Sequence, residues 1–161
     1  MCNVKQRLFL ILLSLSIIAL CLMQAAHAAF SVVNKLSFGT VAILNNSTPS
    51  EITIHLNNQY TITNHIRVLR PGQRGEYLLS AYPPYTQLFV SANITFTQTA
   101  STVGSSEQFT LTSLTTAPSV TTDAAGTATI YVGGTLQTSG SGAGQYFDTD
   151  YSVSFDISIN Y

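Results

Sequence analysis

Cysteine and tryptophan are nearly absent from this chain of 161 residues. It contains no tryptophan, and its two cysteines, Cys2 and Cys21, both lie near the N-terminus. The segment from residue 29 onward therefore has no cysteine, and no disulfide within it can stabilise the fold. A segment of this length can bury roughly two-thirds of its unfolded surface, which is enough for one self-supporting hydrophobic core.

Charged residues are also scarce, at 8% of the chain. After residue 28 there are four cations and seven carboxylates, which gives a net charge of −3. This balance disfavours nucleic acid and acidic membrane surfaces as partners. The polar residues are mainly Ser, Thr and Asn, and together with Val, Ile, Tyr and Phe they favour β-strands over helices.

The N-terminus has the pattern of a secretory signal peptide. Lys5 and Arg7 precede the apolar run Leu8–Met23, and an Ala-x-Ala cleavage site follows. We predict that residues 1–28 are removed after contacting the membrane only during export, and that residues 29–161 form one domain. The general secretory route would deliver it to the periplasm, the cell surface or the extracellular space. A membrane anchor is the alternative, but the run is shorter than the ~20 residues of a typical span.

The last eleven residues alternate strictly between apolar and polar side chains. Successive side chains of a strand point to opposite faces, so this pattern predicts a terminal strand with one buried face. The residues expected on that core face are Tyr151, Val153, Phe155, Ile157, Ile159 and Tyr161.

Shorter segments with an apolar face recur along the rest of the domain, separated by turns rich in Gly, Pro, Asn and Ser. The segments are Leu36–Leu44, Glu51–Leu56, Tyr60–Leu69, Glu76–Ser80, Gln87–Gln98, Phe109–Leu114 and Ala128–Leu136. This spacing predicts an all-β protein, an antiparallel immunoglobulin-like β-sandwich of about seven to nine strands.

Several of these segments carry a family resemblance. Leu36–Val41, Tyr131–Leu136, Ala143–Tyr146 and the closing Ile159–Tyr161 resemble the bacterial secreted proteins catalogued as domain of unknown function 4402. The closing pattern is also similar to spore coat protein U-like and fimbrial, pilin-like subunits. The resemblance implies an exported, pilin-like sandwich and transfers no catalytic residue.

Catalytic and metal-binding patterns are weak. His55 and His65 lie outside any triad, nucleophile-elbow or metal-ligand spacing, although a cross-strand metal pair between them is geometrically possible. Asp148 and Asp150 are two positions apart, which leaves a weak calcium site open, but no complete calcium loop follows. We expect a non-enzymatic protein without a cofactor or resident metal.

Two groups of side chains are candidates for an interaction surface. Arg67, Arg70 and Arg74 lie within eight residues and suit an anionic polysaccharide or a neighbouring subunit, unless they form a solvated turn. Tyr82 and Tyr85 flank two prolines and suit a stacking platform, unless they pack as a corner of the sandwich.

The function that these features favour is a cell-surface or fimbria-like structural or adhesion subunit. Its sheet edges would pair with strands from copies of itself or from other surface subunits. Residues 29–35 are apolar enough to be a short donor segment. A small outer-membrane β-barrel is the alternative, because an aromatic C-terminus after alternating apolar residues also closes such barrels. A secreted carbohydrate-binding module or hydrolase is a further alternative, without residues that single it out.

Overall fold

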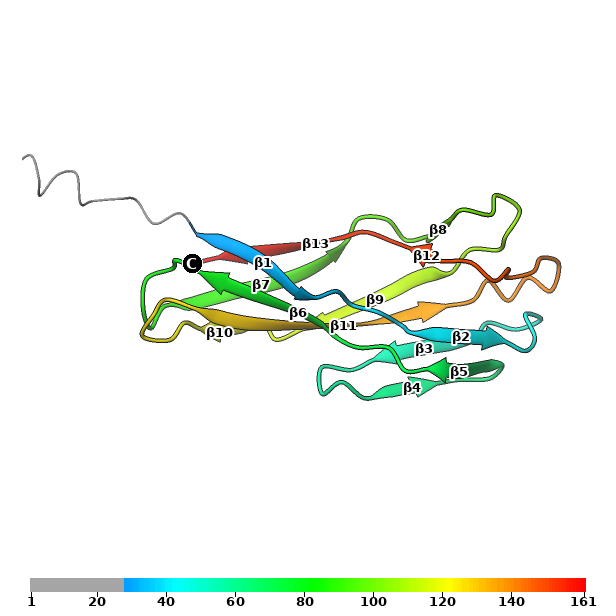
Figure 1. The fold of residues 1–161 in the computed structure, drawn as a ribbon, viewed down its shortest axis with the longest axis horizontal. Coiled ribbons are helices and arrows are strands. Elements are labelled where there is room, and N and C mark those ends of the chain that lie inside the picture. The colour runs from blue at the N-terminus through cyan, green and yellow to red at the C-terminus, as the bar shows by residue number, and fades with distance from the viewer. Residues whose placement is uncertain (1–27) are drawn as a thin grey trace, which may run out of the picture.

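The computed structural model describes residues 28–161, so the predicted signal peptide lies outside the described residues except for its last position. The described part is built from antiparallel strands and contains no helix (Figure 1). No helix in that part is therefore long and apolar enough to span a bilayer. The strands are β1 (Ala29–Asn34), β2 (Thr40–Ile43), β3 (Glu51–Ile54), β4 (Tyr60–Ile62), β5 (Ile66–Arg70), β6 (Gly75–Ser80), β7 (Gln87–Ile94), β8 (Ala100–Ser101), β9 (Thr110–Thr116), β10 (Ser119–Thr121), β11 (Ala128–Gln137), β12 (Tyr151–Ser152) and β13 (Phe155–Asn160).

The larger sheet is organised around the long strand β11. Its order is β1-β6-β11-β3-β4, and β9 also pairs with β11. β6 pairs with the first half of β11, placing Tyr77 opposite Ile130, and β3 pairs with the second half, placing Ile52 opposite Leu136. The strands β2 and β5 form a separate two-stranded ladder.

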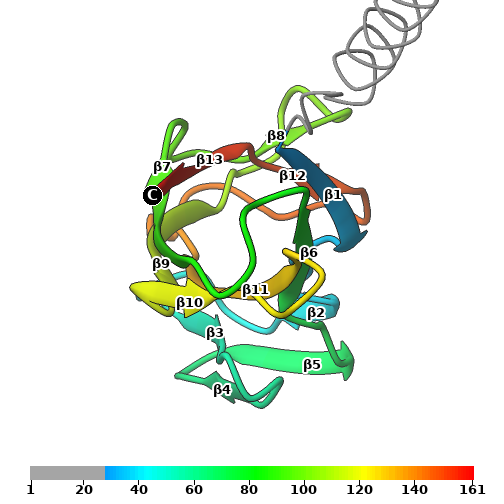
Figure 2. The same ribbon diagram turned by 90° about the vertical axis from the view of Figure 1, so that its left-hand side faces the viewer.

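The second layer is the three-stranded sheet β10-β7-β13. Viewed along the long axis, β7 and β13 lie on one side of the domain, and β1 and β6 lie on the other (Figure 2). The structure thus confirms the predicted all-β antiparallel sandwich. The segment Tyr60–Leu69, which the sequence leaves open as one strand or two short ones, forms two, β4 and β5, and the predicted strand Leu36–Leu44 is shortened to β2.

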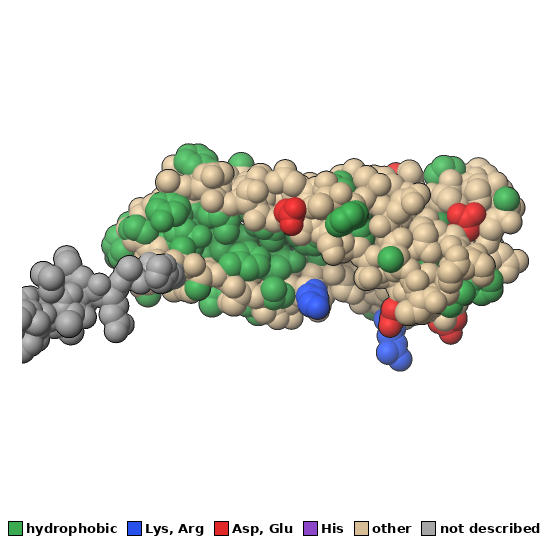
Figure 3. All heavy atoms as spheres, turned by 90° about the horizontal axis from the view of Figure 1, so that it is seen from above, with side chains coloured by type: hydrophobic (Ala, Val, Ile, Leu, Met, Phe, Trp, Pro, Cys, Tyr) green, Lys and Arg blue, Asp and Glu red, His purple; other side chains and the backbone are tan. Residues whose placement is uncertain are grey.

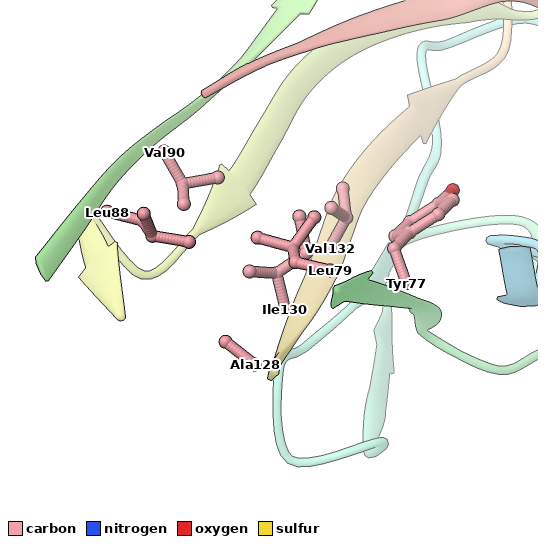
Figure 4. Packing of buried hydrophobic residues seen from close by; sticks show 7 residues of the cluster. All are labelled: Tyr77, Leu79, Leu88, Val90, Ala128, Ile130 and Val132. Atoms are coloured by element: carbon pink, nitrogen blue, oxygen red, sulfur yellow. The ribbon is translucent and has the colours of Figure 1, made fainter. Parts of the chain in front are cut away.

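One hydrophobic core lies between the two layers (Figure 4). Leu79 from β6 and Val132 from β11 are fully buried against Leu88 from β7. Each such side chain contributes about 1.5–3 kcal/mol relative to exposure. These contacts hold the second sheet over β6 and β11, and therefore position β13.

A second core lies toward the other end of the domain and is rich in aromatic rings. The ring centroids of Phe109 and Tyr146 are 4.3 Å apart, and Tyr151 meets Phe109 edge to face at 4.9 Å. Ile52 and Leu111 are buried in the same cluster. The Tyr151 hydroxyl also hydrogen-bonds to Phe147, which fixes the loop before β12.

The C-terminal segment contributes side chains to both cores, and this explains why it is not one continuous strand. Val153 packs in the second core, whereas Phe155 packs against the first. The segment breaks at Val153 and Ser154, so that β12 pairs with β8 and β13 pairs with β7. The single terminal strand expected from the sequence is therefore corrected to two strands that belong to different ladders.

Candidate strand-binding site

An apolar strip lies on the face of the sandwich where β1 and β13 end the two sheets. Hydrophobic side chains gather there over one half of the molecule (Figure 3). Phe30 and Val32 of β1 are directly opposite Leu79 and Tyr77 of β6, so they share the core-facing side. They nevertheless remain 46% and 51% exposed. Core-facing side chains are thus left uncovered on this face.

Tyr77 forms part of the base of the apolar strip. Its ring stacks on that of Phe30, with centroids 5.3 Å apart and an interplanar angle of 22°. Burial raises the pKa of Tyr77 above its ordinary value, and a hydrogen bond with the backbone of Leu36 partly opposes this effect. The tyrosine is therefore neutral at physiological pH and acts as an apolar surface.

The opposite border of the apolar strip is β13. Phe155, Ile157 and Ile159 pack against the first core but are only half-buried. Tyr161, which the sequence places on the same face, is 72% exposed and meets the Tyr82 ring edge to face at 5.2 Å. The inner side of β13 is therefore incompletely covered by its own chain.

The backbone of β13 has one unpaired edge. Val90 of β7 donates its backbone N–H to Pro118 at 2.9 Å, so the even-numbered residues of β7 direct their polar groups toward β10. These directions alternate along an antiparallel strand, so the odd-numbered residues of β7 direct their polar groups toward β13. In β13, Ser158, for example, therefore bonds to β7, whereas Ile157 points its N–H and C=O away from β7. No other described strand pairs with that side of β13. The residues that present free backbone groups there are Phe155, Ile157 and Ile159.

This edge differs from the other free edges of the described strands. The strands β4, β8, β10 and β12 have three residues or fewer. The ladders of β1, β2, β5 and β9 contain register shifts. β13 has six residues in unbroken register, with no proline or cation and with Asp156 as its single charge. Short length, irregularity and charge are what protect sheet edges from further pairing, so β13 is the least protected edge.

The three arginines predicted as an interaction surface lie in different surroundings. Arg67 and Arg70 lie on β5. Arg74 lies 3.6 Å over the Tyr131 ring and donates one hydrogen bond from its guanidinium to the Leu56 carbonyl. One of the three cations is thus engaged within the domain.

The two tyrosines flanking the prolines are also separated in role. Tyr82 packs against the first core and Tyr161, near the end of the apolar strip. Tyr85 is 75% exposed and has a left-handed backbone with φ of 56°. Tyr82 thus packs as a corner of the sandwich, whereas the Tyr85 ring is open to solvent.

The candidate metal ligands lie in loops, with His55 directly after β3 and His65 directly before β5. The His55 ring hydrogen-bonds to Thr61 at 3.1 Å. Within residues 28–161, no three His, Cys, Asp or Glu side chains converge as metal ligands. Asp148 and Asp150 lie in the loop that leads to β12.

The open edge was only partly visible in the sequence. The sequence predicts the alternation of Phe155, Ile157 and Ile159, and it suggests residues 29–35 as a short donor segment. In the structure this segment forms β1, which pairs with β6 of its own chain. The adjacent Val32 and Val33 and the register shift beside them obscure its alternation, so the sequence pattern alone carried little signal.

Comparisons with known proteins give a family but no described activity. The family model described as Domain of unknown function (DUF4402) matches residues 29–161. No curated protein and no solved structure matches the chain. Because the family model covers most of the sequence, the chain belongs to the DUF4402 family.

Proposed function

We propose that this protein is a non-enzymatic structural or adhesion subunit, exported to the bacterial cell surface, that associates with other chains by strand addition. The observation that carries the proposal is the unprotected edge of β13 beside an uncovered apolar strip. Strand addition uses main-chain hydrogen bonds for affinity and alternate side chains for specificity. The site offers both kinds of contact.

The energetic gain comes from two sources. A strand added along β13 would pair the free backbone groups of Phe155, Ile157 and Ile159, with a net gain of about 0.5–1.5 kcal/mol for each hydrogen bond. Its apolar side chains would also cover Phe30 and Val32, at about 25 cal/mol for each Å² removed from water. Apolar contact and backbone pairing therefore both contribute to the free energy of strand addition.

The chemistry of the site also favours contact over catalysis. The side chains gathered along the apolar strip are Phe, Val, Ile and Tyr, and burial keeps Tyr77 protonated. Such groups bind extended segments well and offer no nucleophile or base at neutral pH. This supports a subunit or adhesion role.

A matched pair of lysine variants tests the proposal. Ile159→Lys places a charge on the core-facing side of β13, whereas Ser158→Lys places it on the exposed side of the same strand. The full chain should be exported from a bacterial host and its native size measured by chromatography with light scattering. We expect association in the wild type and in Ser158→Lys, and its loss in Ile159→Lys. Identical size distributions in all three proteins would refute the proposal.

Cell fractionation provides the second measurement. The export prediction requires the processed chain to appear outside the cytoplasm, with its new N-terminus at Ala29. Retention of residues 1–28 in the cytoplasm would contradict the exported role, whatever the native size.

A further inference from the structure

We propose that the strand pairing with β13 is β13 of a second copy of this chain, antiparallel and related by a two-fold axis through Ile157. This inference rests on the proposed function, because it names the partner at the same edge. It follows from the direction of the backbone groups, the order of side chains and the charge along β13.

The backbone geometry suits this arrangement. With the axis through Ile157, this residue lies opposite its own counterpart, and Phe155 lies opposite Ile159 of the second copy. These three residues are the ones whose N–H and C=O groups point away from β7. Opposed residues of this kind exchange two hydrogen bonds each in an antiparallel ladder. All outward backbone groups of β13 are therefore paired in one symmetric register.

The neighbouring symmetric registers are less favourable. An axis through Asp156 would place two carboxylates directly opposite each other, and like charges in that position are destabilising. An axis through Ser158 would place Phe155 opposite Tyr161, beyond the end of β13. Only the register centred on Ile157 satisfies the whole edge without opposing like charges.

Both faces of the joined strand are compatible with this register. On the core-facing side, Ile157, Phe155 and Ile159 of the two copies form one continuous apolar row. On the outer side, Asp156 lies opposite Ser158 of the second copy, and its own chain already holds it through the Thr95 hydroxyl at 2.7 Å. The isologous contact is thus apolar toward the core and free of opposed like charges toward solvent.

The apolar strip adds to this interface. Because β1 and β13 end the two sheets on the same face, a second copy at β13 also brings its own Phe30 and Val32 to that side. The ladder itself is only six residues long, which is small beside the ≈ 800 Å² per partner of a standard interface. We therefore expect a reversible dimer whose population rises with concentration.

Cysteine trapping tests the register, because residues 29–161 contain no cysteine. Asp156→Cys and Ser158→Cys are exposed changes. The two positions face each other in a non-hydrogen-bonded pair, whose Cα separation of about 4.5 Å allows a disulfide. A mixture of the two exported variants should form the mixed disulfide dimer at least tenfold faster than either variant forms its own dimer.

A charge series provides an independent readout. Ser158→Lys should tighten the dimer by about fivefold, and Ser158→Glu should weaken it by a similar factor, because each dimer contains two pairs with Asp156. Sedimentation equilibrium measures both constants. Equal rates for mixed and unmixed cysteine variants, or cross-links only to a different protein, would overturn the second copy as the partner.

These results separate the two proposals. If Ile159→Lys abolishes association while the cysteine pair does not trap a mixed dimer, strand addition stands and the occupant is a different strand. If Ile159→Lys leaves association unchanged, both proposals fail.

Discussion

Two isoleucines facing the same core give a direct measure of how open the apolar strip is. Ile130 of β11 is 4% exposed and lies in the middle of the core (Figure 4). Ile157 of β13 packs against the same cluster but is half-buried. Truncation to alanine removes the same three carbons at both positions, so any difference in cost reports on their surroundings.

The expected costs follow from burial. For Ile130→Ala, losing three buried carbons at about 0.8 kcal/mol each, together with the cavity left behind, gives about 3–4 kcal/mol. For Ile157→Ala, roughly half of the transfer cost applies and no closed cavity remains, which gives about 1 kcal/mol. The isolated chain should therefore tolerate the second change far better than the first.

Urea unfolding measures both values through circular dichroism and tyrosine fluorescence. The experiment is run at a protein concentration low enough for a monomer and then repeated at high concentration. We expect the cost of Ile157→Ala to rise with concentration as an added strand covers the side chain, while that of Ile130→Ala stays constant. If both variants lower the free energy of unfolding of the monomer equally, the conclusion that the apolar strip is left uncovered is wrong.

Two further predictions concern residues away from β13. Arg74→Met should lower the free energy of unfolding by about 1–2 kcal/mol, because it removes the contact with Tyr131 and a hydrogen bond. The control Arg67→Met, measured in the same urea assay, should change the free energy of unfolding by no more than about 0.5 kcal/mol. Equal losses in the two variants would contradict the assigned contacts. Hydrogen bonding, first from the Thr127 hydroxyl, lowers the pKa of Asp123. Its stabilising effect is therefore present above the ordinary aspartate pKa and is lost as pH falls through the lower folded value. The thermal midpoints of wild type and Asp123→Ala should differ near neutral pH, and the difference should shrink as the pH is lowered through the acidic range. A difference that stays constant with pH would contradict this.

Much of the fold followed from local patterns. The alternation in Ala128–Leu136 predicted β11 nearly to its observed bounds, and Glu76–Ser80 predicted β6. These strands lie in the core, where one face is buried along the whole length. Their sequence period and their structure therefore agree.

The candidate site was predicted only in part, for physical reasons. Alternation identifies a core-facing side chain but does not tell how fully another chain segment covers it. Ile157 and Ile130 show the same pattern and differ in burial, because β13 ends its sheet while β11 lies inside one. Arg74 could not be assigned to Tyr131 either, since that contact joins residues 57 positions apart.

The sequence by itself determined an all-β domain without disulfides, and it determined which side of the terminal segment is apolar. These properties depend on composition and on a period of two, both of which are local. Only the tertiary structure decided that this segment divides between two cores, that β1 pairs with β6, and that β13 keeps an unpaired edge. Pairing and coverage are relations between distant segments, so they are fixed only when the two sheets pack together.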